Sequence, residues 1–273
     1  MKTVLVINGE SYWQDFLPDH KVVQKKIQTA NWIIKQGKLY VTDAEGTVIP
    51  DLILWRVGAI APSHKQTDAL NIIALSGVRC INSAACLIKG FDRLSMLNQL
   101  KKLGIPTIDF DVATSPHLLH NIKRDFPFVL KVGNYHGGYG KVLIKNDEQW
   151  QEARDFAFVT SHYATTEPFI NYTRDIRYLI IGDKVWAMAR KGKYWKANVE
   201  TTSFEKIAPE AEFERHIRNL KKTIGATILA IDILEDNAGK KLVVEYNDIP
   251  GISGFSDELK YELSACVKQA LQD

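Results

Sequence analysis

Three polar side chains near the end of the chain interrupt two neighbouring apolar runs. Glu245 and Asn247 stand two residues apart in the second run, so on a strand their side chains point the same way. Asp232 lies in the first run, residues 228–234, where burial would otherwise be expected. A short polar turn, residues 235–239, separates the runs and predicts an antiparallel pair with all three side chains on one face.

Two carboxylates and an amide oxygen form a hard-oxygen ligand set. Such a set suits magnesium, or the similar ion manganese, shared with substrate phosphates. Ordinary solvent-facing acids on a surface hairpin are the alternative interpretation of Asp232, Glu245 and Asn247.

A glycine-rich loop, residues 133–140, lies between two further strand-like runs. It is not a P-loop, because Tyr135 occupies the position of the leading glycine and no helix opens after it. The pattern favours a β-hairpin flap whose backbone N–H groups can close over phosphates. Lys131 enters the loop and Lys141 leaves it, so two cations flank it. A mobile surface hairpin with incidental lysines is the alternative.

Beyond the flap, the segment 164–170 is extended and carries Pro168, which suits an edge strand or a crossing between lobes rather than an inner strand. Its backbone groups could pair with a flat base, and Asp175 just beyond it could reach sugar hydroxyls. Read in isolation, the segment is equally typical of a connector between lobes.

A cationic run follows the next predicted hairpin. Arginine and lysine near a magnesium site can hold a γ-phosphate and the anion to which it passes. A charged surface loop is the alternative. The cationic and neighbouring residues of this run are Arg190, Lys191, Lys193, Tyr194, Trp195, Lys196 and Asn198. The histidines show no ligand spacing, and His136, in the flap, has no assigned role at this point.

The elements that must position these residues follow two patterns along the chain. The first third alternates strand and helix, which predicts a small, mainly parallel α/β unit whose ligand edge lies near Asn8, Arg56 and Asn82. Within it, apolar residues at helical spacing predict a helix over residues 23–34 that Gly37 stops. From residue 164 the chain is rich in strands, with further helices predicted over 92–103, 147–156, 210–224 and from about 257.

Composition excludes several classes of protein. The chain has 273 residues, of which 45% are hydrophobic and 25% charged, as in an average soluble globular protein. A formal charge of +3 is too small to argue for nucleic acid, and no run approaches the ~18 apolar residues of a membrane span. The N-terminus enters a strand directly, without a signal peptide, and three cysteines without CxxC spacing are expected to be reduced. We therefore expect a cytoplasmic protein.

Taken in order, these features resemble the ATP-grasp superfamily. Residues 133–146, 165–170, Arg190 and the Trp195–Lys196 pair with Asn198 resemble the ATP-binding domain of synapsins. Residues 231–234 and 244–251 are more similar to the bacterial (RimK-like) ligases that add glutamate to a ribosomal protein, as are residues 56–58 and Asn82. The resemblance implies an α/β, ATP-grasp fold: an N-terminal domain over 1–90, a central lobe with the flap over 91–165, and a C-terminal lobe with the magnesium site over 166–273.

The resemblance also implies roles for individual residues. Arg190, Lys196 and Asn198 would act where nucleotide and acceptor meet, and Asp232, Glu245 and Asn247 would hold magnesium. One departure is visible, because Arg93 stands where the family usually has lysine. The residues implied in ATP binding are Arg93, Lys131, Gly137, Gly138, Lys141, Glu167, Phe169 and Asp175.

The implied activity is that of an ATP- and magnesium-dependent carboxylate–amine ligase. The γ-phosphoryl group would pass to a carboxylate, and an amine, from a small molecule or a peptide, would attack the acylphosphate and release phosphate. The families resembled also allow a homodimer. Two alternatives use the same ATP site: a synapsin-like ATP-binding protein without ligase activity, and a phosphoryl transferase acting on a hydroxyl. The complete set of Asp232, Glu245 and Asn247 favours the ligase.

Overall fold

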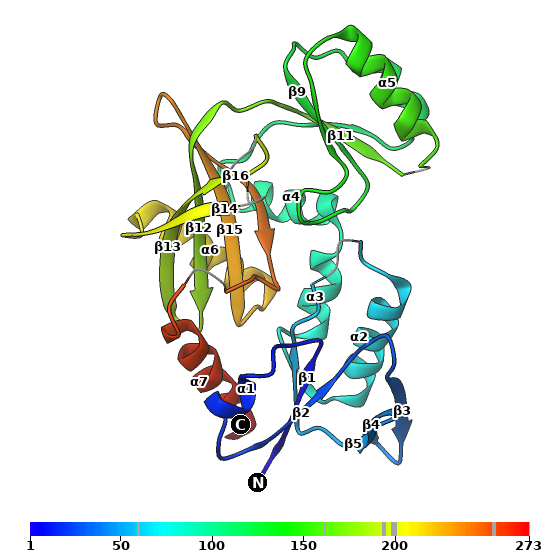
Figure 1. Cartoon of the computed structure of the whole chain (residues 1–273), viewed down its shortest axis with the longest axis vertical. Coiled ribbons are helices and arrows are strands. Elements are labelled where there is room, and N and C mark those ends of the chain that lie inside the picture. The colour runs from blue at the N-terminus through cyan, green and yellow to red at the C-terminus, as the bar shows by residue number, and fades with distance from the viewer. Residues whose placement is uncertain (59–60, 161, 193–194, 198–200, 253–254, 273) are drawn as a thin grey trace.

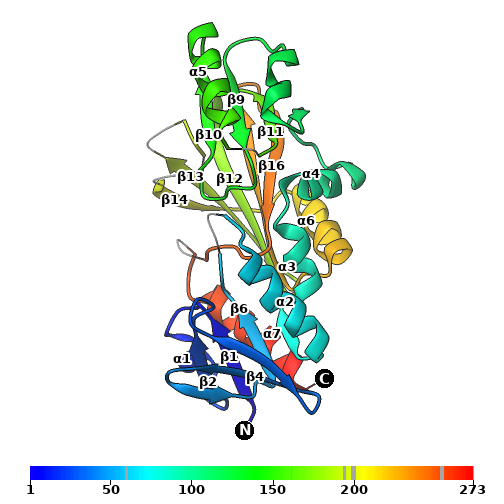
Figure 2. The ribbon, with the colours of Figure 1, turned by 90° about the vertical axis from the view of Figure 1, so that its right-hand side faces the viewer.

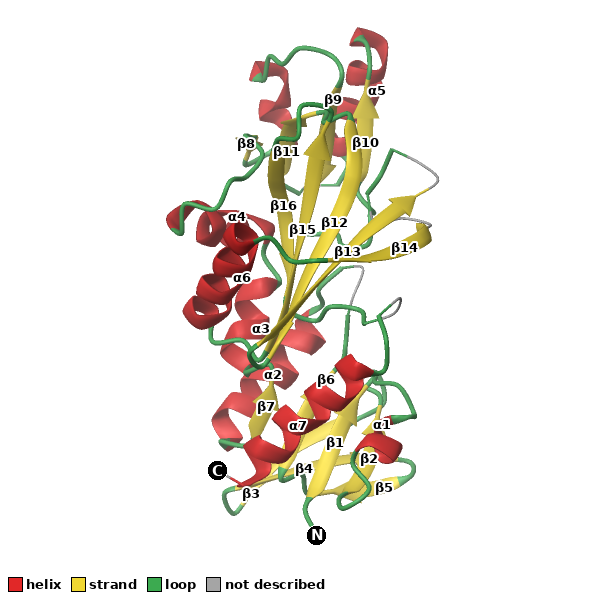
Figure 3. Cartoon of the chain, turned by 90° about the vertical axis from the view of Figure 1, so that its left-hand side faces the viewer, coloured by secondary structure: helices red, strands yellow, loops and turns green. Residues whose placement is uncertain are grey.

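The computed structural model describes the chain except for residues 59–60, 161, 193–194, 198–200, 253–254 and 273. Three sheet-containing units follow one another along the long axis of the molecule (Figure 1). Both chain ends lie in the unit at one extreme, and helices α4, α6, α3 and α2 follow one another along one side (Figures 2 and 3).

The first unit is built on a four-stranded parallel sheet in the order β2-β1-β6-β7. This confirms the predicted parallel α/β unit. A core cluster buries Trp13 of α1 and Leu263 of α7 between this sheet and the five-stranded sheet of the third unit, so the last helix ties the chain end back to the beginning. Its elements are β1 (Thr3–Ile7), α1 (Trp13–Phe16), β2 (Lys21–Lys25), β6 (Leu52–Trp55), α2 (His64–Ser76), β7 (Arg79–Ile81), α3 (Ala84–Gly90) and α7 (Glu258–Gln272).

The helix predicted over residues 23–34 is wrong. The segment forms the end of β2, a turn and β3 (Asn31–Lys35), which continues into β4 (Lys38–Asp43) and β5 (Gly46–Val48) as a separate antiparallel sheet. Gln36 and Gly37 both have positive φ and form a two-residue hairpin turn, so Gly37 does not end a helix. The apparent helical spacing arose because Ile27 and Ala30 are buried from a turn and not from a helix face.

The central unit is a four-stranded sheet in the order β10-β9-β11-β8, with α5 packed beside it. Strand β11 is an inner strand, contrary to the edge or crossing position that Pro168 suggested. The proline is tolerated because it is the last residue of β11, beyond the pairing with β8, which ends at Thr166. The elements are β8 (Asp111–Ala113), η1 (Pro116–Asn121), β9 (Phe128–Val132), β10 (Lys141–Ile144), α5 (Asp147–Phe158) and β11 (Ala164–Pro168). Helix α4 (Arg93–Lys102), which precedes them, packs into the core of the third unit.

The third unit is a five-stranded antiparallel sheet in the order β14-β13-β12-β15-β16. The two acid-bearing strands pair as predicted, as do the strands flanking the Gly182–Asp183 turn. The elements are β12 (Tyr172–Ile181), β13 (Lys184–Gly192), β14 (Thr201–Ile207), α6 (Ala211–Ile224), β15 (Ile228–Asp236) and β16 (Lys241–Asn247).

Strand alternation gives this sheet two different faces. Ile176, Tyr178 and Ile180 of β12 point into one core cluster, together with the apolar stripe of α6. Leu179 and Ile181, on the other face, join the cluster that contains α7. That second face is therefore apolar at the end near the first unit, and the remainder of it, toward the central unit, is where the charged residues lie.

Candidate active site

Six polar side chains share the second face of the five-stranded sheet. The register places Asp232 opposite both Arg177 and Glu245, and Arg190 opposite Asp175. Residues opposite one another, and residues two apart on one strand, point to the same side of a sheet. The face therefore gathers the following side chains: Asp175, Arg177, Arg190, Asp232, Glu245 and Asn247.

Asp232 is the centre of this face and is almost fully buried. Arg177 donates Nε to Oδ1 and Nη2 to Oδ2, each at 2.8 Å, and Arg190 Nη2 donates to Oδ1 at 3.0 Å. Asn247 Nδ2 adds a fourth hydrogen bond, to Oδ2 at 3.1 Å. Burial alone would raise the pKa of Asp232, but the two guanidinium groups outweigh it and hold the pKa below the ordinary value.

Glu245 lies across the cleft from the flap. Its Oε2 is 3.6 Å from Lys141 Nζ, so the lysine that leaves the flap reaches the carboxylate on β16. Burial would raise the pKa of Glu245, but the cations of Lys141, Arg93 and Lys131 outweigh it and hold the pKa well below its usual range. Glu245 is therefore ionised at neutral pH.

Two of the three predicted magnesium ligands, Glu245 and Asn247, have an oxygen available for the ion. Glu245 offers an ionised carboxylate, and Asn247 uses its amide nitrogen toward Asp232, which leaves its carbonyl oxygen as a hard ligand. Asp232 already accepts four hydrogen bonds, about the capacity of a carboxylate, so one of them must be released before it can bind a metal. Within the described residues there is no cluster of three or more His, Cys, Asp or Glu side chains, so the amide is needed to complete the set.

The flap lies between β9 and β10 and is tied to α4 at its base. Asn134 Oδ1 accepts hydrogen bonds from the backbone N–H of Arg93, at 3.0 Å, and from the Tyr163 hydroxyl. Arg93 Nη2 also donates to the carbonyl of Tyr135 at 3.3 Å. Arg93, the residue that departs from the expected lysine, thus lies within the site and holds the flap.

Contacts from the third unit reach the flap tip. Lys196 Nζ donates to the carbonyl of Gly138 at 3.1 Å, which joins the predicted cationic run to the glycines of the loop. Gly137 and Gly138 have φ of +66° and +82°, a backbone conformation that favours glycine. Asn198, Lys193 and Tyr194 of the same run lie outside the described residues.

Lys131 and Glu167 form a buried ion pair on the face of the central sheet that carries Lys141. Burial lowers the pKa of Lys131 to about 8, and Glu167 opposes this shift. The pair borders a small cavity of about 70 Å³ between the central and third units, where the rings of Phe169 and Trp195 lie 6.3 Å apart. This cavity contains the residues expected to contact a base.

Asp175 is placed differently from its expected role. It is only 2% exposed, and its Oδ1 accepts a hydrogen bond from Arg190 Nη2 at 2.6 Å. In this position it orients Arg190 and does not present its carboxylate to the cleft surface. Asn82, named from the sequence as part of a ligand edge, likewise uses its whole amide on the backbone of residues 227, 228 and 248.

A second cavity, of about 420 Å³, opens where all three units meet. The first unit contributes the residues after β6, the flap contributes two residues, and the third unit contributes Arg177 and the end of β16. Its described lining residues are Val57, Gly58, Pro62, Gly90, Phe91, His136, Gly137, Arg177, Tyr246, Asn247, Asp248, Ile249 and Gly251. We call it the junction pocket. It is lined by Asn247, one of the three residues predicted to bind magnesium.

Two residues of the site were not predicted from the sequence. Arg177 binds Asp232 through Nε and Nη2, on one edge of its guanidinium. The signal for it was present, because it follows Asp175 by two positions on one strand. Asp248 is also buried, and burial raises its pKa to about 7. Its carboxyl packs against Gly90, which is distant in sequence, so no local pattern could have indicated this contact.

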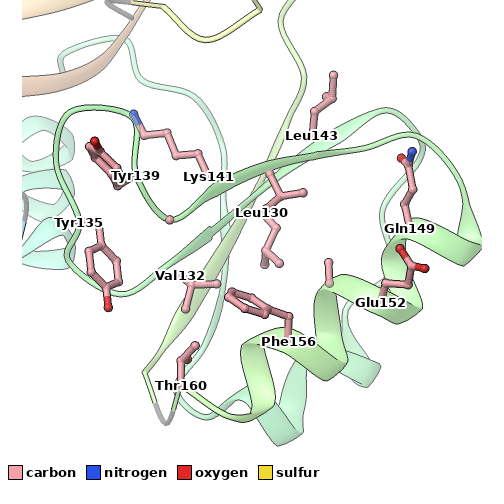
Figure 4. A pocket seen from close by; sticks show the side chains of 13 residues that line it. Leu130, Val132, Tyr135, Tyr139, Lys141, Leu143, Gln149, Glu152, Phe156 and Thr160 are labelled. Atoms are coloured by element: carbon pink, nitrogen blue, oxygen red, sulfur yellow. The ribbon is translucent and has the colours of Figure 1, made fainter.

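A third, larger cavity of about 620 Å³ is apolar and lies apart from the charged face. All of its described lining residues fall between Leu130 and Thr160, on the flap hairpin and α5. Figure 4 shows Phe156 of α5 and Val132 of β9 beside this space, with Tyr135 and Tyr139 at its flap end. Its lining also includes Lys141, which pairs with Glu245.

Comparison with known proteins places the chain in a family. Residues 104–268, more than half of the sequence, match the family described as "Synapsin, ATP binding domain". The chain belongs to the synapsin ATP-binding domain family. The match spans the flap, the charged face and the acidic strands of this family member.

Relatives of this family member cover most of its length. A protein from Coxiella burnetii named "Probable alpha-L-glutamate ligase" is 26% identical over 235 residues, which span 81% of the chain and 76% of the relative. One of the same name from Nitrosococcus oceani is 29% identical over 219 residues, 75% of the chain and 70% of the relative.

Solved structures establish the fold. The RimK domain protein ATP-grasp from Sphaerobacter thermophilus superposes with a TM-score of 0.74 at 14% identity, covering 99% of both chains. D-alanyl-alanine synthetase A from Vibrio cholerae superposes with a TM-score of 0.76 at 13% identity, covering 99% of this chain and 97% of the other. The chain therefore has the ATP-grasp fold, as the sequence predicted. Among the described helices, none has the length and apolar character that crossing a membrane requires.

Proposed function

We propose that this protein is an ATP- and magnesium-dependent carboxylate–amine ligase that acts through an acylphosphate. The observation that carries the proposal is the meeting of two charged surfaces. The face holding Glu245, Asn247 and Arg190 lies opposite the flap that holds Lys131 and Lys141, and one ion pair, Lys141 to Glu245, already spans them. Relatives named glutamate ligases and the superposed synthetase favour amide formation.

We assign the residues as follows. Lys131 and Lys141 bind the nucleotide phosphates, with Arg93 and the backbone of the flap glycines Gly137 and Gly138 closing over them. The backbone of Glu167 and Phe169 meets the adenine. Glu245 and Asn247, with Asp232 once one of its hydrogen bonds is released, hold magnesium, or manganese in its place. The ion, when bound, neutralises phosphate charge.

The third unit then orients the transfer. Arg190, held by Asp175 and Asp232, meets the γ-phosphate as it passes to the substrate carboxylate. Asp175 holds Arg190 in this step, and its predicted contact with the ribose stays part of the proposal. Arg177 lines the junction pocket and supplies a cation for the carboxylate. Lys196, with Asn198 beyond it, closes the flap tip and excludes water from the acylphosphate.

The proposal also covers the domain boundaries, the oligomeric state, the location and the amine acceptor. We expect domain boundaries at residues 90 and 165, a homodimer, a cytoplasmic location and an amine acceptor that is an amino acid or a peptide. Limited proteolysis tests the boundaries and light scattering tests the dimer.

The activity test measures ADP release. With magnesium-ATP and a panel of amino acids and glutamate-containing peptides, at least one pair should raise ADP release above a Glu245→Gln control. If no pair does so, the ligase assignment fails. The two alternatives that use the same ATP site, an ATP-binding protein without ligase activity and a phosphoryl transferase acting on a hydroxyl, would then account for the site.

Nucleotide binding is tested separately by thermal unfolding. Magnesium-ATP should raise the melting temperature, because a ligand that binds only the folded state stabilises it. Combining Asp232→Asn with Asn247→Ala should remove the magnesium-dependent part of that shift. A shift of full size in the double variant would contradict the metal-site assignment.

A further inference from the structure

We propose that His136, in the flap, is a further catalytic residue: it contacts the attacking amine in the junction pocket and takes up its proton. This inference rests on the proposed ligase function. It assigns the amine to one wall of the junction pocket and gives the flap a chemical role beyond covering phosphates.

The position of His136 is the first support. His136 and Gly137 are the flap residues that line the junction pocket, whose opposite wall carries Asn247 and Arg177. A carboxylate activated beside Asn247 would therefore lie between the metal strands and the flap. An amine approaching from the rest of the pocket meets His136 on its way.

Hydrogen bonds hold the backbone on both sides of His136, which limits where its ring can lie. The carbonyl of Tyr135 accepts a hydrogen bond from Arg93, and the carbonyl of His136 accepts one from the backbone N–H of Tyr139 at 3.3 Å. The loop base is held by Asn134, which binds both α4 and Tyr163. Groups that act in catalysis need such positioning by their surroundings.

The charges near the ring suit a proton acceptor. Burial lowers the pKa of His136, Arg93 and Lys141 lower it further, and Glu245 opposes them. The imidazole is therefore neutral at neutral pH and has a free lone pair on one nitrogen. The position of His136 in the lining of the junction pocket does not depend on its pKa.

Other lining groups are less suited to the role. The amide of Asn247 and the guanidinium of Arg177 do not accept protons at neutral pH. Asp248 Oδ2 is enclosed against Gly90, where an added Cβ would lie 2.0 Å from it, and has no hydrogen-bond partner among the described residues. This oxygen cannot meet an incoming amine, and the carboxyl also accepts hydrogen bonds from the backbone of residues 248 and 249.

The step balances without another reactant. The amine nitrogen attacks the carbonyl carbon of the acylphosphate, a C–N bond forms, and the C–O bond to phosphate breaks with its electron pair leaving on phosphate. The amine proton passes to the His136 ring nitrogen and then to water. Proton transfer by a positioned side chain contributes about 10²–10⁴-fold to such rates.

The experiment compares two nucleophiles on wild-type protein and His136→Asn. The carboxylate is L-glutamyl-L-glutamate, and the nucleophiles are L-glutamate and hydroxylamine, which is largely unprotonated at neutral pH. Amide formation should fall about 10²-fold in the variant. Hydroxamate formation should fall less than about threefold, because this nucleophile needs little help in losing a proton. His64→Asn, an exposed histidine at the start of α2, is the matched control and should leave both rates unchanged.

The outcomes separate the two proposals. If wild-type protein forms both products and His136→Asn forms the amide at the wild-type rate, the role of His136 is wrong and the ligase function stands. An equal loss of amide and hydroxamate would also overturn it, since that pattern indicates a structural contribution to the flap. If wild-type protein forms neither product and releases no ADP with any member of the panel, the ligase function itself fails, and the inference with it.

Discussion

The two surfaces that meet at the cleft are built in opposite ways. On the five-stranded sheet, Asp232 is held by two arginines and an amide, all fixed to neighbouring strands by backbone pairing. The flap, by contrast, is a loop of eight residues. Lys196 donates one hydrogen bond to its tip, and Lys141, which follows the flap on β10, pairs with Glu245.

The contrast separates two tasks. A preorganised, mutually neutralised charge network keeps its geometry whether or not substrate is present, as electrostatic catalysis requires. A flap held by a few partly exposed contacts can open for nucleotide at little cost in free energy. Changes on the sheet should therefore affect stability as well as activity, and changes on the flap should affect ligand binding with little effect on stability.

The largest effect is expected from Asp232→Ala. It leaves Arg177 and Arg190 buried without their common partner, and breaking a buried ion pair on one side costs about 3–5 kcal/mol. Urea unfolding without nucleotide measures the loss. Lys141→Ala, which removes the cation that follows the flap, is the comparison and should cost less than Asp232→Ala, because Glu245 keeps the cations of Arg93 and Lys131 nearby. If both variants lost the same free energy of unfolding, the proposed difference in stability between the sheet and the flap would be wrong.

Glu245→Gln should leave the fold intact and lower turnover about 10²–10³-fold, because it removes a charge that faces the reacting phosphates. ADP release at saturating magnesium-ATP measures it. Glu235→Gln, on the same hairpin but paired with Arg174 away from the charged face, should retain wild-type turnover. A Glu245 variant with wild-type turnover at low magnesium would show that the metal set is wrongly chosen.

Gly140→Ala tests the strain that the flap can bear. Gly140 has φ of +66°, where a residue with a Cβ costs about 1–2 kcal/mol. An added Cβ would also lie 2.8 Å from the carbonyl oxygen of Val132, which is a clash. The nucleotide-induced rise in melting temperature should shrink. Gly225→Ala, at φ +69° with no atom near its Cβ, carries the backbone penalty alone and should keep the nucleotide shift. Matching shifts would mean that the flap does not close over nucleotide.

Lys131 gives the flap side a pH dependence. Its pKa in the folded protein is lowered to about 8, so the free protein loses this charge as pH rises above 8, whereas bound phosphate retains it. Affinity for ATP should therefore fall up to about tenfold per pH unit above 8. Lys131→Arg keeps its charge and should bind with constant affinity between pH 7 and 9.5. Calorimetry at several pH values measures both proteins, and a flat profile for the wild type would contradict the assignment.

The sequence predicted which side chains share the charged face, but few of the contacts that hold them in place. Asp232, Glu245 and Asn247 were predicted to converge because strand alternation and one short turn determine their side, and the register confirms that they share a face. The contacts that fill the four acceptor positions of Asp232 come from three strands, and spacing along the chain cannot report them. The helix predicted over 23–34 failed because periodicity over so few residues does not distinguish a turn between strands from a helix face.

The smallest effect is expected from Lys196→Met, which removes the hydrogen bond to the carbonyl of Gly138. A single partly exposed contact of this kind contributes about 1 kcal/mol or less, so the free energy of unfolding should change by no more than that. Opening of the flap should become up to about fivefold more frequent, since 1 kcal/mol corresponds to that factor. Hydrogen exchange at the flap amides measures this opening, with the amides of β15 as the internal reference. If exchange in β15 rises as much as exchange in the flap, the two surfaces are coupled in one cooperative unit, and the division of tasks between rigid sheet and opening flap is wrong.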